Sequence, residues 1–240
     1  MTLDEVRTRL RDVASPEHAR VLQGYFKTGP GEYAEGDRFL GVRLPALRKL
    51  AKEAAALPLE EAEELLRSPT HEERLLALLV MVRAYQKGDA ALRNRIHGAY
   101  LAGTRYVNNW DLVDSSAEHL VGAHLRDGDR SLLDRLAASE SVWERRIAAI
   151  ATLYFIKRGE FEDTLRVAAL LLRDRHDLVH KAVGWMLREV GKRDREAEEA
   201  FLREHCRAMP RTMLRYAVER FPEPLRRAYL RGEPPAGEAG

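Results

Sequence analysis

Apolar residues recur at spacings of three and four along most of the chain. The stretches with this pattern include LPALRKLAKEAAAL, HEERLLALLVMVRAYQKG, SVWERRIAAIATLYFIKRG, HDLVHKAVGWMLREVGKRD and PRTMLRYAVERF. This spacing places the apolar side chains on one face of an α-helix, and no comparable stretch alternates with the period of two typical of a half-buried strand. The pattern therefore predicts an all-α fold.

Residues that commonly cap helices stand at the expected boundaries. Pro69, Thr70 and Asp177 lie near helix starts, and glycines follow the polar last turns. These glycines are Gly88, Gly128, Gly159 and Gly191. Two segments lack helical periodicity: a loop at 27–41 rich in Gly, Pro and charge, and the tail GEPPAGEAG at 232–240. We expect one helical domain over residues 1–231 and a disordered tail over 232–240.

The long helices form an internal repeat. HEERLLALLVM, SVWERRIAAIA, HDLVHKAVGWM and MPRTMLRYAVE recur at intervals of roughly 35 residues, a period typical of HEAT-like helix pairs. We expect a curved α-solenoid with one concave face. Basic residues occupy similar positions in the four repeats, namely Arg74, Arg146, Lys181 and Arg215. A row of cations along a concave face would attract a polyanion such as duplex DNA, whereas a protein-binding scaffold for acidic peptides is the alternative.

Composition narrows the class of protein. A chain of 240 residues with 45% hydrophobic and 32% charged residues can bury a substantial core. The single cysteine, Cys206, permits no intramolecular disulfide, which suits a reducing compartment. The N-terminus lacks an apolar signal core, and the longest apolar-rich run, residues 75–82, is far shorter than the roughly 20 residues of a membrane span. We expect a cytoplasmic protein without membrane contact and, because a solenoid can have polar ends, a monomer.

The three tryptophans mark candidate functional positions. In NNWDLVDSS, Trp110 and Asp114 stand at i and i+4 on one helix face, whereas Trp143 and Trp185 each precede an arginine by three residues. Most tryptophans pack in a core, and Trp143, near a helix start, fits that role best. We expect Trp110 and Trp185 to be exposed on the concave face, with Gly184 leaving room for a partner to approach.

The combination of W-D-x-x-D with G-W-x-x-R-E resembles the AlkD-like family of DNA alkylation repair glycosylases. These HEAT-like solenoids remove cationic alkylpurines from duplex DNA, and the resemblance extends from about Tyr25 to Pro222. It implies that Trp110 and Trp185 are aromatic walls of a lesion cleft and that Asp114 is the catalytic carboxylate. It also implies DNA contacts by Tyr25, Arg146 and Arg188. We include Arg43 in the DNA-binding set, although it stands where the family has a polar amide.

The chemistry of the reaction suits these residue types. Alkylation at N3 or N7 makes the purine a cationic leaving group, and its departure leaves an oxocarbenium-like sugar. A carboxylate can stabilise that sugar and position water, while indole faces attract the cationic nucleotide. The resemblance implies a reaction without base flipping and therefore no deep base pocket. We expect Asp111 to be a capping or surface acid. No lysine nucleophile is expected, so the DNA strand should stay intact.

Other kinds of site find little support. His71, His176 and His180 could in principle bind a metal ion, but H-x-x-x-H lacks the glutamate of a zincin, and we expect no metal and no cofactor. No phosphate-binding G-x-x-x-x-G-K-[ST] motif occurs. Two alternatives to the glycosylase remain, namely a non-catalytic binder of damaged or branched DNA and a protein-binding scaffold.

Overall fold

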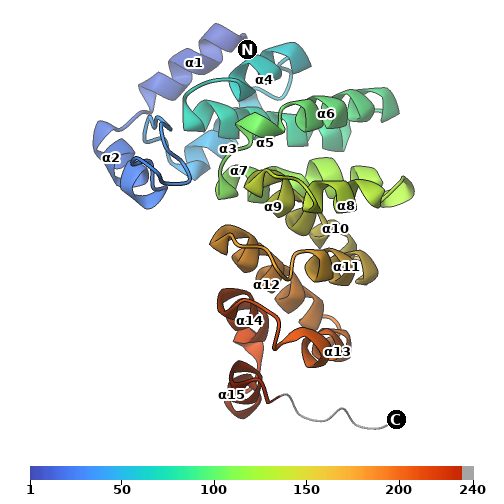
Figure 1. Ribbon diagram of the computed structural model, residues 1–240. Helices are drawn as coiled ribbons and strands as arrows, with labels where there is room; N and C mark the ends of the chain where they lie inside the picture. The colour runs from blue at the N-terminus through green and yellow to red at the C-terminus, as the bar shows by residue number, and fades with distance from the viewer. Residues whose placement is uncertain (234–240) are drawn as a thin grey trace. The chain divides into compact units, whose positions relative to one another are not determined.

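The computed structural model describes residues 1–233, and its regular structure is helical (Figure 1). No strand occurs in this range, and a single isolated bridge joins Arg38 to Thr70. The all-α prediction is confirmed. Residues 234–240 of the predicted tail lie outside the described residues, whereas Gly232 ends the last helix in a left-handed conformation with φ 75°. Within residues 1–233, no helix combines the length and apolarity that a membrane crossing requires.

The chain divides into two compact units, Met1–Leu120 and Val121–Gly240, which we call the first and second units. The first contains α1 (Leu3–Asp12), α2 (Pro16–Tyr25), α3 (Leu44–Glu53), α4 (Leu59–Leu66), α5 (His71–Lys87), α6 (Ala90–Ala102), the 3-10 turn η1 (Thr104–Tyr106) and α7 (Trp110–Ala117). A π-helical turn, η2 (Glu118–Gly122), spans the boundary. The single domain and the curved solenoid stay predictions.

Helix α5 is the centre of the first unit, where it packs against α3, α4, α6 and α7. Its sequence is apolar on almost every side, so neighbours must cover it all round. Leu76, Ala77 and Leu78 are each fully buried. Burial extends to the polar first turn, where His71, Glu72 and Arg74 are at most 3% exposed. Buried polar groups need hydrogen-bond partners, so side chains or backbone groups from other segments must bond to this turn.

The loop at 27–41 closes over this polar first turn. Glu72 accepts backbone N–H groups from Leu40 at 3.0 Å, Gly41 at 2.7 Å and Val42 at 3.2 Å. Gly41 has φ 80°, and a Cβ there would lie 2.1 Å from the carbonyl oxygen of Ser15, so only glycine fits. The end of the loop is thereby fixed between α2 and α5.

The second unit contains η3 (His124–Asp127), α8 (Ser131–Ala137), α9 (Val142–Ala151), α10 (Leu153–Ile156), α11 (Glu162–Leu170), α12 (Asp177–Gly191), α13 (Arg195–His205), α14 (Arg211–Ala217), η4 (Val218–Arg220) and α15 (Glu223–Arg231). Its central helix, α12, packs against α9, α13 and α14. A Cβ on Gly184 would lie 2.3 Å from the carbonyl oxygen of Met213. The expectation that Gly184 leaves room for an external partner is therefore wrong, because α14 occupies that space.

The predicted row of cations is wrong at two of its positions. Arg74 and Arg146 are only 3% and 5% exposed. Arg74 forms an ion pair with Asp37 of the loop, and the Arg146 guanidinium donates to the carbonyl oxygen of Leu178. Lys181 is paired with Asp177 at 2.6 Å, whereas Arg215 is exposed. Periodicity alone could not show that a loop and a helix start cover the first two side chains.

Candidate functional site

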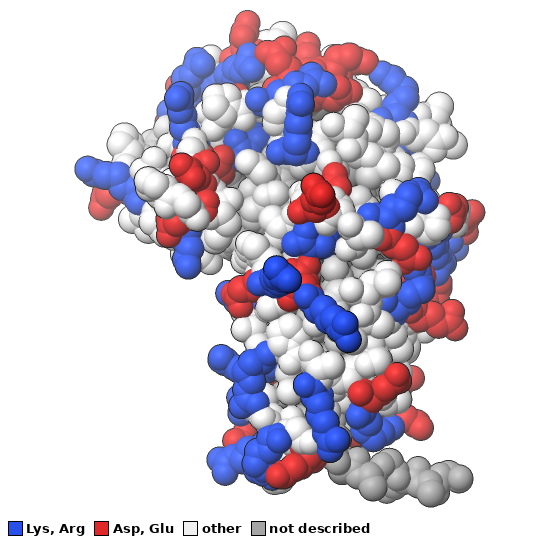
Figure 2. Space-filling view, in the orientation of Figure 1, with Lys and Arg blue, Asp and Glu red and all other residues white. Residues whose placement is uncertain are grey.

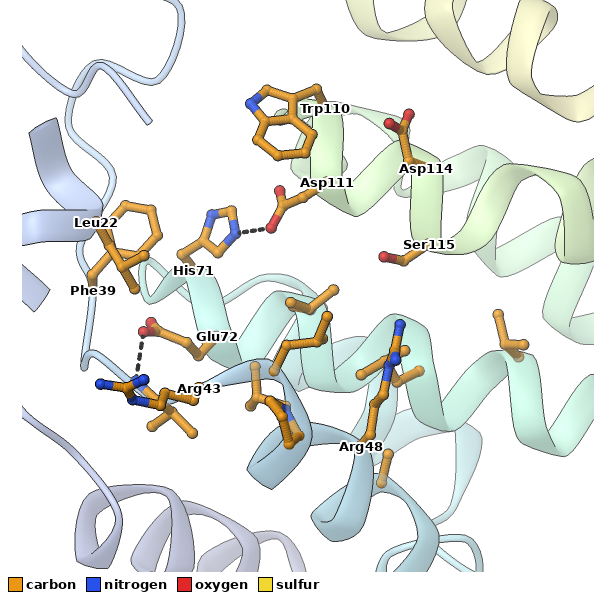
Figure 3. A pocket seen from close by; sticks show the side chains of 18 of the residues that line it. Leu22, Phe39, Arg43, Arg48, His71, Glu72, Trp110, Asp111, Asp114 and Ser115 are labelled. Atoms are coloured by element: carbon orange, nitrogen blue, oxygen red, sulfur yellow. Dashed lines mark hydrogen bonds and ion pairs between the residues drawn. The ribbon is translucent and has the colours of Figure 1, made fainter. Parts of the chain in front are cut away.

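The first unit contains a cavity of about 880 Å³ bounded by α3, α5 and α7 (Figure 3). Its floor is apolar and includes Leu75, Leu79 and Val82 of α5. The wall formed by α7 is polar and carries Trp110, Asp111, Asp114 and Ser115; the opposite wall carries Arg43 and Arg48. A partly apolar hollow with a few convergent polar groups is the usual form of a binding or catalytic site.

Helix α7 begins at the predicted site motif. The side chain of Asn109 accepts the Trp110 N–H at 2.8 Å, and Asn109 is fully buried. Because the helix starts at Trp110, this residue and Asp114 project from the same side of α7, one turn apart (Figure 3). Both line the cavity. The structure therefore brings together the aromatic ring and the carboxylate that the sequence singled out.

Other aromatic residues hold the Trp110 indole. Phe26 stacks on it with ring centroids 5.2 Å apart, and Tyr25 meets it edge-on at 6.0 Å. The indole Nε1 donates to the Tyr33 hydroxyl at 3.2 Å. Tyr25 itself is 62% exposed. Trp110 is thus fixed in orientation, and Tyr25 beside it presents an open aromatic surface to solvent.

Beneath Trp110 lies a buried chain of charges that sequence reasoning missed. His71 bridges two carboxylates: Nδ1 lies 3.0 Å from Asp37 Oδ2, and Nε2 lies 2.8 Å from Asp111 Oδ2. Arg74 pairs with the other oxygen of Asp37. The ring of His71 also stacks on Phe39 with centroids 4.5 Å apart. We call Asp37, His71, Arg74 and Asp111 the ionic chain; it ties the loop to α5 and to the first turn of α7.

The environment of His71 favours its charged form. Burial alone disfavours an imidazolium, but the hydrogen bonds and negative charges of Asp111 and Asp37 outweigh it and raise the pKa of His71 to about 9. Burial likewise opposes the charge on Asp37, yet the hydrogen bond from His71 and the Arg74 guanidinium lower the pKa of that carboxyl. At neutral pH His71 is therefore cationic and Asp37 anionic.

In the second unit, Trp185 is half-buried on α12, and its Nε1 donates to Glu189 at 3.1 Å. Arg188, one turn further on, is 17% exposed and forms an ion pair with Glu219. Trp143 is 9% exposed, which confirms the core position expected for it. Arg146 is 5% exposed and donates to the Leu178 carbonyl, and its contact with DNA stays a prediction.

Surface charge is unevenly distributed within each unit. Acidic side chains gather over α4 of the first unit, whose sequence is LEEAEELL (Figure 2). Basic side chains gather over α14 and α15 of the second unit, which carry Arg211, Arg215, Arg226, Arg227 and Arg231 (Figure 2). A polyanion would avoid the surface over α4 and favour the one over α14 and α15.

The sequence profile of the DNA alkylation repair enzyme family matches residues 6–221. The chain belongs to this family. A solved structure described as a predicted DNA alkylation repair enzyme from Enterococcus faecalis is 18% identical, covers 88% of this chain and 97% of its own, and has a TM-score of 0.67. That similarity supports the fold, and family membership supports a role in DNA repair with DNA as a partner. The comparison with curated proteins gave no match.

Within the described residues of this DNA alkylation repair family member, no group of three or more His, Cys, Asp and Glu side chains is placed to hold a metal ion. His71 is used in the ionic chain, and His176 caps α12 by accepting the N–H of Leu178 at 3.2 Å. The Nε2 atom of His180 lies 2.6 Å from the carbonyl oxygen of Asp174, so all three histidines considered as metal ligands have structural partners.

The stability of this repair-family protein should depend on pH through His71. A folded pKa of about 9 lies above the unfolded value of 6.5, so the stabilisation is complete below pH 6.5 and is lost as pH rises through 9. We expect the stability difference between wild type and His71→Gln, measured by urea unfolding at pH 6 to 10, to shrink over this interval. Parallel pH profiles for the two proteins would show that His71 is not charged in the fold.

Proposed function

We propose that this protein hydrolyses the N-glycosidic bond of cationic N3- or N7-alkylated purines in duplex DNA. The observation that carries the proposal is the placement of Trp110 and Asp114 on one side of α7, where both line the cavity, in a chain of the DNA alkylation repair family. Tyr25, exposed beside Trp110, adds a second aromatic surface at this site.

Each side chain has a role that follows from the charge of the reaction. The Trp110 face attracts the cationic nucleotide through its quadrupole. The Asp114 carboxylate stabilises the oxocarbenium-like sugar that forms as the base leaves, and it orients or deprotonates the attacking water. Because alkylation has already activated the leaving group, the mechanism needs no strong general acid.

Asp111 is assigned a different role from Asp114. Its Oδ2 accepts from His71 at 2.8 Å and its Oδ1 accepts the Leu112 N–H at 2.8 Å, so both oxygens are engaged. Asp111 therefore positions α7, which leaves the chemistry to Asp114.

The remaining site residues contact DNA in the proposal. Tyr25 and Arg43 do so in the first unit, and Trp185 and Arg188 in the second. Arg188 can bind a phosphate by exchanging Glu219 for it, because that pair is partly exposed. Arg146 belongs to the proposed DNA-binding set as well, as the family resemblance implies. Its guanidinium also donates to the carbonyl oxygen of Leu178 in the first turn of α12.

The test is base release from methylated duplex DNA, followed by chromatography and compared with a protein-free sample that corrects for spontaneous loss. We expect release of a methylpurine above the protein-free rate, with the DNA backbone intact. A nicked strand would contradict the proposed hydrolysis. DNA binding without release would indicate a non-catalytic binder, and no DNA affinity at low salt would indicate a protein-binding scaffold.

A further inference from the structure

Arg48 and Arg83 line the cavity of the first unit. Arg48 lies on α3 and Arg83 on α5, and among residues 1–233 neither has a side-chain hydrogen bond or ion pair. Arg67 and Arg95, by contrast, are each paired with a glutamate. Figure 3 shows the Arg48 side chain rising from α3 toward Ser115 on α7. Both guanidinium groups are therefore available to a ligand in the cavity.

The carboxylates that line the cavity do not neutralise these two arginines. Glu72 is 2% exposed and accepts three backbone N–H groups from the loop. Asp111 is held by His71. The remaining carboxylate in the lining is that of Asp114, whereas three arginines line the same cavity: Arg43, Arg48 and Arg83. The part of the cavity next to α3 is accordingly electropositive, and an anion there gains from a partly enclosed environment.

The side chains of this region suit one backbone unit of DNA, a phosphate with its sugar. Guanidinium groups match the geometry of phosphate oxygens and form charge-assisted hydrogen bonds with them. Leu79, which is half-buried in the cavity floor, offers an apolar surface to the sugar next to that phosphate. A free inorganic anion would use the arginines without this apolar floor.

We propose that Arg48 and Arg83 hold a backbone phosphate of the DNA strand that meets Trp110 and Asp114, with Leu79 beneath the adjoining sugar. The inference rests on the proposed function, because it assumes that the bound strand is the one that meets Trp110 and Asp114. It concerns DNA binding alone and requires no bond cleavage. It extends the DNA contact of the first unit from the first turn of α7 to α3 and to the last turns of α5.

The test is the salt dependence of binding to unmodified duplex DNA. Each phosphate neutralised contributes about 0.9 to the slope of log K against log salt concentration. The double variant Arg48→Ala/Arg83→Ala should lower the absolute slope by about one and weaken binding. Its thermal unfolding should match that of wild type, because neither side chain has a partner within residues 1–233 to lose.

A matched control removes the same charge elsewhere in the first unit. Arg11 and Arg20 are exposed, lie outside the cavity lining and likewise lack a side-chain partner among the described residues. Arg11→Ala/Arg20→Ala should leave the slope at the wild-type value. Equal losses of slope in both double variants would reveal a general effect of net charge and overturn the phosphate site, as would an unchanged slope in Arg48→Ala/Arg83→Ala.

Base release separates this inference from the proposed function. If the slope falls in the cavity variant while wild type releases no base, the phosphate site stands and the glycosylase proposal fails. If wild type releases methylpurine while the slope is unchanged, the phosphate site fails alone. With both correct, Arg48→Ala/Arg83→Ala should raise KM and leave kcat near wild type, because a contact made equally in ground and transition states affects binding only.

Discussion

Replacing Asp114 by Asn should slow methylpurine release from duplex DNA by about 10²–10⁴-fold, the range over which a positioned charge or base accelerates such a step. The amide has almost the same shape as the carboxylate, so the packing of α7 is preserved. It carries no negative charge to stabilise the oxocarbenium-like sugar, and it cannot accept a proton from water. Single-turnover release with enzyme in excess measures the chemical step directly.

The neighbouring residue provides the control for this prediction. Ser115 lies next to Asp114 on α7 and also lines the cavity. Ser115→Ala perturbs the same wall without removing a charge, and its release rate should stay within a few fold of wild type. Duplex affinity should be nearly unchanged in Asp114→Asn. A wild-type release rate in Asp114→Asn would remove this residue from the mechanism.

Replacing Asp37 by Ala should lower the free energy of unfolding by about 3–5 kcal/mol, the usual effect of removing one partner from a buried ion pair. The Asp37 side chain is 6% exposed and is shared by Arg74 and His71, which are 4% and 2% exposed as side chains. Its loss leaves two buried cations facing each other across the position that it vacates. Urea unfolding at pH 7 measures the change.

A control in the same loop separates the charge from the loop itself. Glu35 is exposed, and its carboxylate accepts the Gly31 N–H at 2.9 Å. Glu35→Ala should change the stability by about 1 kcal/mol or less, as expected for an exposed hydrogen bond. His71→Gln combined with Asp37→Ala should cost less than the sum of the two single changes, because the groups act as one network. Additive effects would argue against the ionic chain.

The sequence predicted those helices correctly whose apolar periodicity runs unbroken through one stretch. The stretch beginning at His71 forms α5, and the one beginning near Asp177 forms α12, as periodicity indicated. The stretch SVWERRIAAIATLYFIKRG was expected as one helix but is divided into α9 and α10. At the division, the Thr152 hydroxyl donates to the Ala149 carbonyl at 2.7 Å. Such a side-chain bond competes with the helical ladder and leaves no trace in apolar spacing.

In the candidate site too, the sequence predicted contacts between residues close together in the chain and missed contacts between residues far apart. Trp110 and Asp114 share one helix, so their spacing was sufficient to place them on one side of it. Asp37 and Asp111 lie 34 and 40 residues from His71, and no periodicity relates them. His71 therefore resembled a possible metal ligand and Asp111 a surface acid. The available signal was the acid Asp37 in a glycine-rich loop ahead of an apolar helix with a polar first turn.

The ionic chain also determines how the loop can be exchanged between related proteins. A transplanted loop that brings Asp37 and Tyr33 without His71 and Arg74 would bury a carboxylate with no cation to meet it. The loop, the first turn of α5 and the first turn of α7 consequently form one module for engineering. Chimaeras that respect its boundaries should fold, and chimaeras that divide it should accumulate as insoluble protein.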